Sequence, residues 1–120
     1  MAEVLATYSY TLQSDNTYSI TCTNRDVCTK AIIPSEYESL PVKSIDNGAF
    51  SGCSSLTSVI IPDSVMSINP GAFAYCSSLT SVIIPYSVLS IGEGAFTYCS
   101  SLKNIMISNG VVGISFGAFN

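Results

Sequence analysis

The sequence repeats itself with a period of 23 residues, and this repeat constrains the fold more than any other feature. The ten residues from Cys53 to Pro62, CSSLTSVIIP, recur unchanged from Cys76 to Pro85. A unit of this length cannot bury an apolar face alone, whereas stacked units share one interior, so the pattern predicts a solenoid. Seven apolar columns keep one register: Ile45, Ile68, Ile91, Ile114; Phe50, Phe73, Phe96, Phe119; Cys53, Cys76, Cys99; Leu56, Leu79, Leu102; Val59, Val82, Ile105; Ile61, Ile84, Ile107; and Val65, Val88, Val111.

Each unit carries signals for one strand and one tight turn. The segment Leu56-x-x-Val59-x-Ile61 ends in the apolar–polar alternation of a short half-buried strand, which Pro62 closes. Equivalent strands are expected to pair in parallel, about 4.8 Å apart. The spacing of Phe50, Cys53 and Leu56 predicts a turn of α- or 3₁₀-helix on the opposite, convex side. We therefore expect an α/β-type solenoid in which residues 31–120 form about three and a half coils.

The N-terminal residues follow a different pattern. Residues 8–12 and 18–22 each alternate between apolar and polar side chains, and Asp15-Asn16 between them favours a turn. This pattern is typical of a β-hairpin. Such a hairpin would cap the first coil, because an open solenoid end exposes apolar side chains and unpaired strand edges. The sequence thus predicts a capping hairpin in residues 1–30 and the repeats in residues 31–120.

The complete repeat register resembles that of the BspA-like, Treponema pallidum-type leucine-rich repeats. The pattern is Ile-x-x-x-Ala-Phe-x-x-Cys-x-x-Leu-x-x-Val-x-Ile-Pro-x-x-Val-x-x-Ile, and it fits the chain from Ile45 to Phe119. The resemblance implies a right-handed horseshoe or arc with a parallel sheet on its concave side. It also implies a secreted or cell-surface protein that adheres to host or matrix proteins. This functional expectation rests on analogy with the family and not on identified site residues.

One departure from the family pattern suggests a binding surface. The outward strand position is usually polar in the family, yet in this chain it is apolar in every unit, and so is the position after the valine column from the second unit onward. If these side chains are exposed, they form an apolar strip of about 300–500 Å² on the concave sheet; alternatively, neighbouring side chains half-cover them. The predicted protein-binding residues are Ile32, Ile60, Ile83 and Met106 in the strand, with Met66, Leu89 and Val112 beside them.

The residue types present argue against catalysis. The chain has no histidine, so neither a Ser-His-Asp nor a Cys-His pair is possible, nor is a histidine-containing zinc site. It contains no Walker loop and no dinucleotide fingerprint. Glu36 and Glu38 form the one close carboxylate pair, which a solvated loop explains better than acid–base chemistry. We expect no enzymatic activity, no cofactor and no metal.

The five cysteines fall into two groups. Cys53, Cys76 and Cys99 share a column and should stack about 5 Å apart, a distance that permits a disulfide although parallel side chains suit one poorly. We interpret them as small buried hydrophobic residues, with a ladder of metal-binding thiolates as the alternative. Cys22 and Cys28 either remain free or close a small loop in an oxidising compartment.

Charge and hydropathy narrow the choice of partners. Charged residues make up 10% of the chain, against about 25% in a typical globular protein, and the net charge is −4. No basic patch is available for phosphates and no segment approaches the roughly 18 apolar residues of a membrane span, so we expect neither nucleic-acid binding nor membrane insertion. No signal peptide is visible, which leaves a cytoplasmic location open beside the surface location that the resemblance implies.

Two functions are compatible with these observations. The first is a non-enzymatic module for protein binding or adhesion, with a host protein, a matrix protein or a second copy of the chain as partner. The second is a structural protein that assembles into a dimer or filament through the apolar strip or through an uncapped C-terminal coil, whose last core residue is Phe119.

Overall fold

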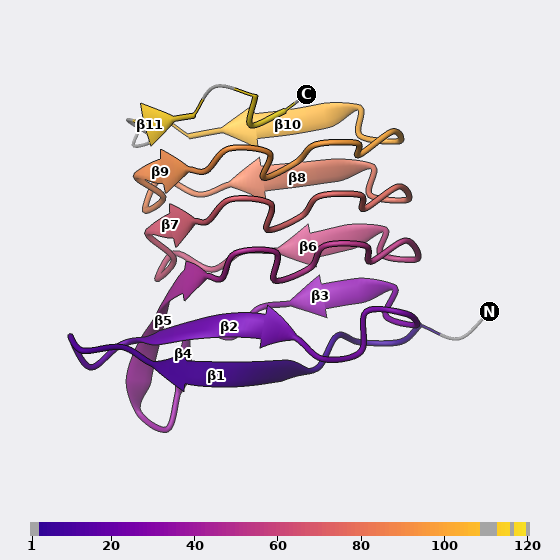
Figure 1. The fold of residues 1–120 in the computed structure, drawn as a ribbon. Helices are drawn as coiled ribbons and strands as arrows, with labels where there is room; N and C mark the ends of the chain where they lie inside the picture. Colours follow the sequence, from indigo (N-terminus) through magenta and orange to yellow (C-terminus); the bar gives the residue numbers. More distant parts are fainter. Residues whose placement is uncertain (1–2, 109–112, 116, 120) are drawn as a thin grey trace.

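The chain winds into a stack of similar coils that begins at an antiparallel hairpin (Figure 1). The structure is a computed structural model that describes residues 3–108, 113–115 and 117–119. Its strands are β1 (Tyr8–Leu12), β2 (Tyr18–Cys22), β3 (Lys30–Ile32), β4 (Glu36–Tyr37), β5 (Leu40–Ile45), β6 (Ser58–Ile60), β7 (Ser67–Ile68), β8 (Ser81–Ile84), β9 (Ser90–Ile91), β10 (Asn104–Ile107) and β11 (Gly113–Ile114).

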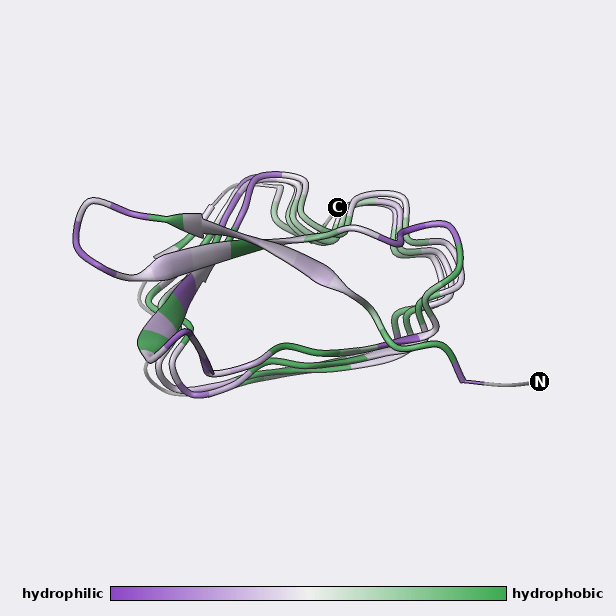
Figure 2. Ribbon diagram, turned by 90° about the horizontal axis from the view of Figure 1, so that it is seen from below, coloured by the Kyte–Doolittle hydropathy of each residue, from purple (hydrophilic) through white to green (hydrophobic). Residues whose placement is uncertain are grey.

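The coils build two parallel sheets on different sides of one interior. Strands β3, β6, β8 and β10 form a four-stranded sheet, in which each strand comes from a different coil. Strands β5, β7, β9 and β11 pair in the second sheet, which the hairpin β1–β2 extends at one end. Viewed along the stack, successive coils superimpose around a shared apolar core (Figure 2). The sequence predicted the first sheet but not the second, whose later strands are only two residues long.

Phenylalanine rings form a continuous file through the core, as the repeat predicted. The ring centroids are 4.9 Å apart between Phe50 and Phe73, 5.2 Å between Phe73 and Phe96, and 5.3 Å between Phe96 and Phe119. The planes of neighbouring rings differ by 10° or less. An aromatic pair of this kind contributes about 0.5–1.5 kcal/mol beyond its buried area. Each coil is therefore held to the next by the same side chain at the same position.

The prediction of helical turns on the convex side is wrong for the described residues, which contain no helix. In an α-helix, the amide of Phe50 would bond to the carbonyl four residues earlier in its own coil. Instead it donates to the Ala72 carbonyl of the next coil at 2.6 Å, and Phe73 does the same to Ala95 at 2.7 Å. The chain makes consecutive tight turns, with Gly48 at a φ of 63°, where glycine is favoured. The fold is thus a solenoid of strands and turns, and not of the α/β type.

The N-terminal residues form the predicted hairpin. Strands β1 and β2 pair antiparallel, with Tyr10 opposite Ile20, and β2 also pairs in parallel with β5. The ring of Tyr8 packs edge-on against Phe50, with the centroids 6.1 Å apart, and so extends the contacts of the phenylalanine file into the hairpin. The division into residues 1–30 and 31–120 stays a prediction, as do the horseshoe curvature and the right hand.

The first repeat unit is longer than the later ones, and its insertion, residues 36–41, folds back onto this hairpin. Strand β4 pairs antiparallel with β5, and the turn between them places Glu38 and Ser39 at φ values of 48° and 68°. As a result, Tyr37 stacks on Tyr10 with their ring centroids 3.7 Å apart and an interplanar angle of 4°. The extra residues therefore add aromatic packing outside the repeat without changing the register of the later coils.

Gly92 provides a test of how closely the coils approach. An added Cβ at Gly92 would lie 2.5 Å from the Pro70 nitrogen and 2.8 Å from the Asn69 carbonyl carbon, both backbone atoms of the previous coil. Because backbone cannot rotate away, we expect Gly92→Ala to lower the free energy of unfolding by about 1–3 kcal/mol. Urea denaturation followed by circular dichroism measures this change. Gly113→Ala is the control, since its Cβ would meet Leu89 oxygen at an ordinary 3.6 Å; equal effects of the two substitutions would contradict the close packing.

Candidate functional site: an apolar row on the four-stranded sheet

The central outward residues of the four-stranded sheet form a row of exposed apolar side chains. We call this set the apolar row; its exposed fractions are 48% for Ile32, 50% for Ile60, 62% for Ile83 and 65% for Met106. The sequence predicted these four residues to share a face, and the structure brings them together.

Side-chain alternation and strand register produce the row. In β8 the residues Ser81 to Ile84 alternate between exposed and buried, so Val82 and Ile84 point into the core while Ile83 points out. Ile83 pairs with Met106 of β10, and Ile32 pairs with Ile60 of β6. Because parallel strands lie about 4.8 Å apart, the side chains form a continuous band across the sheet.

A hollow of about 370 Å³ adjoins the middle of the row. Ile60 and Ile83 line one part of it, and Pro85 and Tyr86 contribute further apolar surface. The Tyr86 side chain is 65% exposed. The sequence analysis missed Tyr86, although a signal was present: the repeat places an aromatic residue here where the preceding unit has Asp63.

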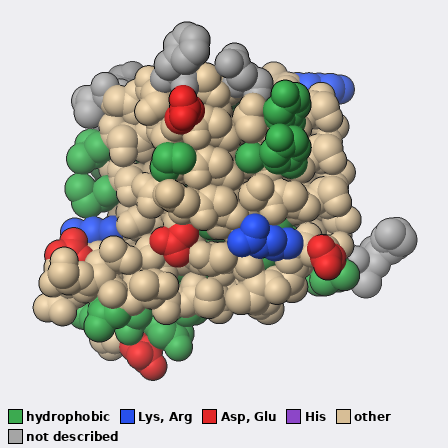
Figure 3. Space-filling model, in the orientation of Figure 1, with side chains coloured by type: hydrophobic (Ala, Val, Ile, Leu, Met, Phe, Trp, Pro, Cys, Tyr) green, Lys and Arg blue, Asp and Glu red, His purple; other side chains and the backbone are tan. Residues whose placement is uncertain are grey.

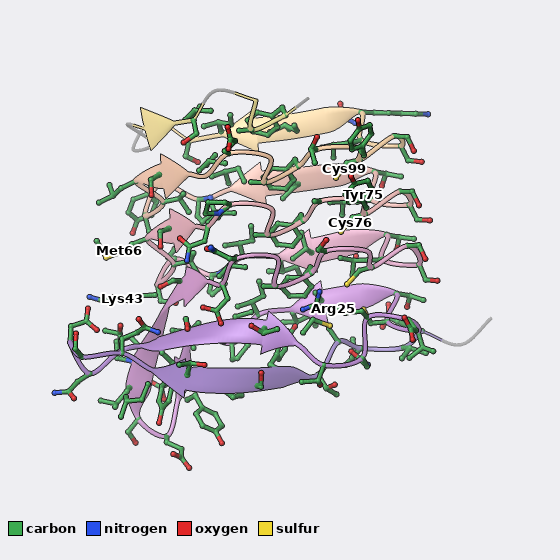
Figure 4. All side chains as sticks on the ribbon, viewed as in Figure 1. Arg25, Lys43, Met66, Tyr75, Cys76 and Cys99 are labelled. Atoms are coloured by element: carbon green, nitrogen blue, oxygen red, sulfur yellow. The ribbon has the colours of Figure 1, made fainter. Side chains whose placement is uncertain are left out.

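The second predicted set lies on another side of the molecule. Met66 and Leu89, exposed to 39% and 42%, precede β7 and β9 of the other sheet. Figure 4 shows Met66 projecting from that edge of the stack. Met66 also borders a polar hollow of about 290 Å³ with Asp15 and Lys43. The structure therefore separates these two residues from the apolar row, and Val112 lies outside the described residues.

Figure 3 presents a side of the molecule other than the one that carries the apolar row. It carries the Gly-Ala-Phe turns, in front of the four-stranded sheet in the view of Figure 1. The exposed rings of Tyr75 and Tyr98 stack here with their centroids 5.0 Å apart. The two tyrosines occupy equivalent positions of successive units, 23 residues apart, so the repeat itself brings their rings together.

The two neighbouring glutamates that the sequence analysis weighed as an acid–base pair lie in an exposed hairpin. Glu36 and Glu38 are both exposed in and after β4, and Glu38 accepts a hydrogen bond from the Tyr18 hydroxyl at 3.3 Å. A pair of this kind in open solvent lacks the buried setting that tunes carboxylates for acid–base chemistry.

The five cysteines are free and lie in or next to the core. The thiols of Cys76 and Cys99 donate to the carbonyls of Phe50 and Phe73 in preceding coils, at 3.2 Å and 3.1 Å. Such contacts fit the prediction that the column cysteines are packing residues.

The docking of the hairpin creates a grouping that the sequence analysis missed. Cys22 and Cys28 meet Cys53, so that all three sulfur atoms lie within 4.8 Å of one another. Burial raises the pKa of Cys28 to about 11, and a hydrogen bond with Cys53, followed by burial, raises the pKa of Cys22. The three thiols are therefore protonated at neutral pH. No local sequence signal reveals this group, because it depends on how the cap docks.

Comparisons with known proteins agree with the architecture. The BspA type leucine-rich repeat region matches residues 13–120 in six copies. A leucine-rich repeat protein from Bacteroides ovatus is 31% identical with a TM-score of 0.80, and the match covers 99% of this chain and 32% of that protein. A leucine-rich repeat protein from Bacteroides capillosus shares the fold with a TM-score of 0.62 at 23% identity, over 85% of this chain and 94% of its own.

The chain thus spans about a third of the Bacteroides ovatus protein. No curated protein matches the sequence. The six matched repeat copies, the register of the core columns and the stacked parallel coils lead to the same assignment. The chain belongs to the BspA-type leucine-rich repeat family.

Proposed function

We propose that the chain is a non-enzymatic protein-binding module and that the apolar row, with the adjoining hollow, is its contact surface. The family supports an interaction role in general. The observation that carries the specific proposal is the exposure of four large apolar side chains in register on one face of a sheet. Burial of apolar surface stabilises a complex by about 25 cal/mol per Å² before the costs of association are subtracted.

The shape of the site favours a protein partner over a small molecule. Drug-sized ligands are usually enclosed in pockets that bury most of their surface. Here the row crosses the open sheet, and a hollow adjoins the part beside Ile60 and Ile83. A partner with a flat apolar patch could cover the row and insert one side chain next to Tyr86, an aromatic residue type that is enriched in interfaces.

The surroundings of the row carry few charges. The outward positions two residues before the row are Lys30, Ser58, Ser81 and Asn104, and Asp63 lines the hollow, so one charge of each sign lies beside the row. Neutral polar side chains contribute little electrostatic steering, so recognition would rest on apolar contact and shape. Adhesion to host or matrix proteins from the cell surface is the form of this function that the family resemblance favours.

In the described part of the chain, no helix is both long and apolar enough to span a bilayer. The contact surface is built from β3, β6, β8, β10 and the segments that follow β6, β8 and β10.

The separation of the two predicted sets allows a matched test. In Ile83→Asp, a carboxylate would be buried without a partner in the contact, and we expect binding to weaken by about tenfold or more. Leu89→Asp adds the same charge on the other sheet and should bind as the wild type does. Surface plasmon resonance over immobilised fibronectin, laminin and collagen would measure both, with circular dichroism confirming the fold.

Two results would count against this proposal. Equal binding by wild type and Ile83→Asp would remove the apolar row as the contact surface. Failure of the wild-type chain to bind any of the three matrix proteins would remove matrix adhesion, the specific form proposed.

Self-association is the second candidate function, and the apolar row favours it. Ile83 and Met106 are 62% and 65% exposed on one face of the four-stranded sheet. An exposed apolar face of this kind can pack against the same face of a second copy. Two copies joined through the same surface would form a closed dimer, whereas head-to-tail contacts could continue as a filament.

Light scattering at a low and a high protein concentration tests this candidate. Self-association predicts a mass that rises with concentration, and Ile83→Asp should abolish the rise if the apolar row is the contact. A monomer mass at both concentrations would exclude self-assembly and leave the binding-module proposal standing.

A further inference from the structure

We propose that Cys22, Cys28 and Cys53 form a binding site for one zinc ion at the junction between the N-terminal hairpin and the first coil. Cys22 ends β2, Cys28 lies in the turn before β3, and Cys53 belongs to the repeat column. Their sulfur atoms lie within 4.8 Å of one another, and the Cys22 and Cys28 sulfurs are 3.9 Å apart. The three side chains are at most 2% exposed.

The spacing of the sulfurs suits a common metal ion. In a tetrahedral site with zinc–sulfur bonds of about 2.3 Å, two ligand sulfurs stand about 3.8 Å apart. The Cys22–Cys28 distance of 3.9 Å already meets this value. The other pairs, at no more than 4.8 Å, need to close by about 1 Å or less, which a small rotation of a side chain provides.

Asn24 supplies a candidate fourth ligand. Its Oδ1 lies 3.3 Å from the Cys22 sulfur and accepts the hydrogen bond of that thiol. The side chain is held in place, since Nδ2 donates to the Leu5 carbonyl and Oδ1 accepts from the Thr7 amide, both at 2.9 Å. When metal binding releases the Cys22 proton to solvent, the lone pair of this oxygen that accepted it becomes available to the ion. Three sulfurs and one oxygen complete the four-coordinate shell that zinc prefers.

The charge at the junction favours a divalent ion. Binding releases one proton from each of the three thiols, so Zn²⁺ with three thiolates carries a net charge of −1, whereas Cu⁺ would leave −2. Arg25 lies at this junction (Figure 4). Its guanidinium donates through Nε to the Cys22 carbonyl at 3.4 Å and through Nη1 to the Ser51 carbonyl at 3.2 Å. One fixed positive charge beside the site balances the zinc complex, and an unbalanced buried charge is costly.

A metal here would join two parts of the fold. Two of the three cysteines come from the N-terminal residues and one from the first coil, so an ion that binds only the folded chain adds its binding energy to folding. Zinc should therefore raise the melting temperature of the reduced protein. Magnesium, which prefers oxygen ligands, should not.

The test uses the reduced, metal-free chain. Competition with a chromophoric chelator measures zinc affinity and stoichiometry, and Cd²⁺ serves as a probe through its thiolate charge-transfer absorption. We expect one ion per chain and the release of three protons. Cys28→Ser should weaken zinc binding by more than about a hundredfold, because loss of an outer partner alone costs about 10–100-fold. The control is Cys99→Ser. The Cys99 thiol donates to the Phe73 carbonyl and lies two units beyond Cys53 in the column, so its loss should leave zinc binding unchanged.

A measurement on the wild type guards against a variant that fails to fold. X-ray absorption at the zinc edge of the loaded wild type should show three sulfur neighbours at about 2.3 Å and one lighter neighbour. Several results would overturn the proposal: no zinc binding, a stoichiometry other than one, loss of binding in Cys99→Ser, or binding of Cu⁺ with none of Zn²⁺.

Discussion

The contact between each coil and the next is the interaction on which the rest of this structure depends. It has two components that share one period. Backbone amides at the Gly-Ala-Phe turns and in both sheets donate to carbonyls of the neighbouring coil. Phenylalanine rings stack in the interior at the same spacing. Because both components require equivalent residues at equivalent heights, a change of register in one coil would break them together.

The same constraint determines which surface is available for function. Residues that face inward pack against their repeat equivalents in the core, whereas residues at outward positions of the four-stranded sheet take no part in core packing. A substitution such as Ile for a polar residue at these positions leaves the stack intact. Because the unit repeats, apolar residues occupy the equivalent position in every coil. They pair across neighbouring strands and so form a continuous row.

Much of this arrangement could be predicted from the sequence. The predictions that were wrong or missing each depend on structure beyond a single strand. The phenylalanine file and the apolar row follow from the period and from strand alternation, which are local. The helical turn was wrong because the Phe50 amide has an alternative acceptor, Ala72, in the next coil. Met66 was placed beside the row because alternation holds within a strand, but the corner after Pro62 turns the chain onto another side. The cysteine group was missed because it depends on how the hairpin docks on the first coil.

The most direct test of this account is the acceptor of the Phe50 amide. Scalar couplings across hydrogen bonds, measured by nuclear magnetic resonance on an isotope-labelled chain, identify the carbonyl that each amide contacts. The account predicts a coupling from the Phe50 nitrogen to the Ala72 carbonyl carbon, and likewise from Phe73 to Ala95. A coupling from Phe50 to Asp46, four residues earlier in its own coil, would show a helical turn and contradict the coil-to-coil bonding.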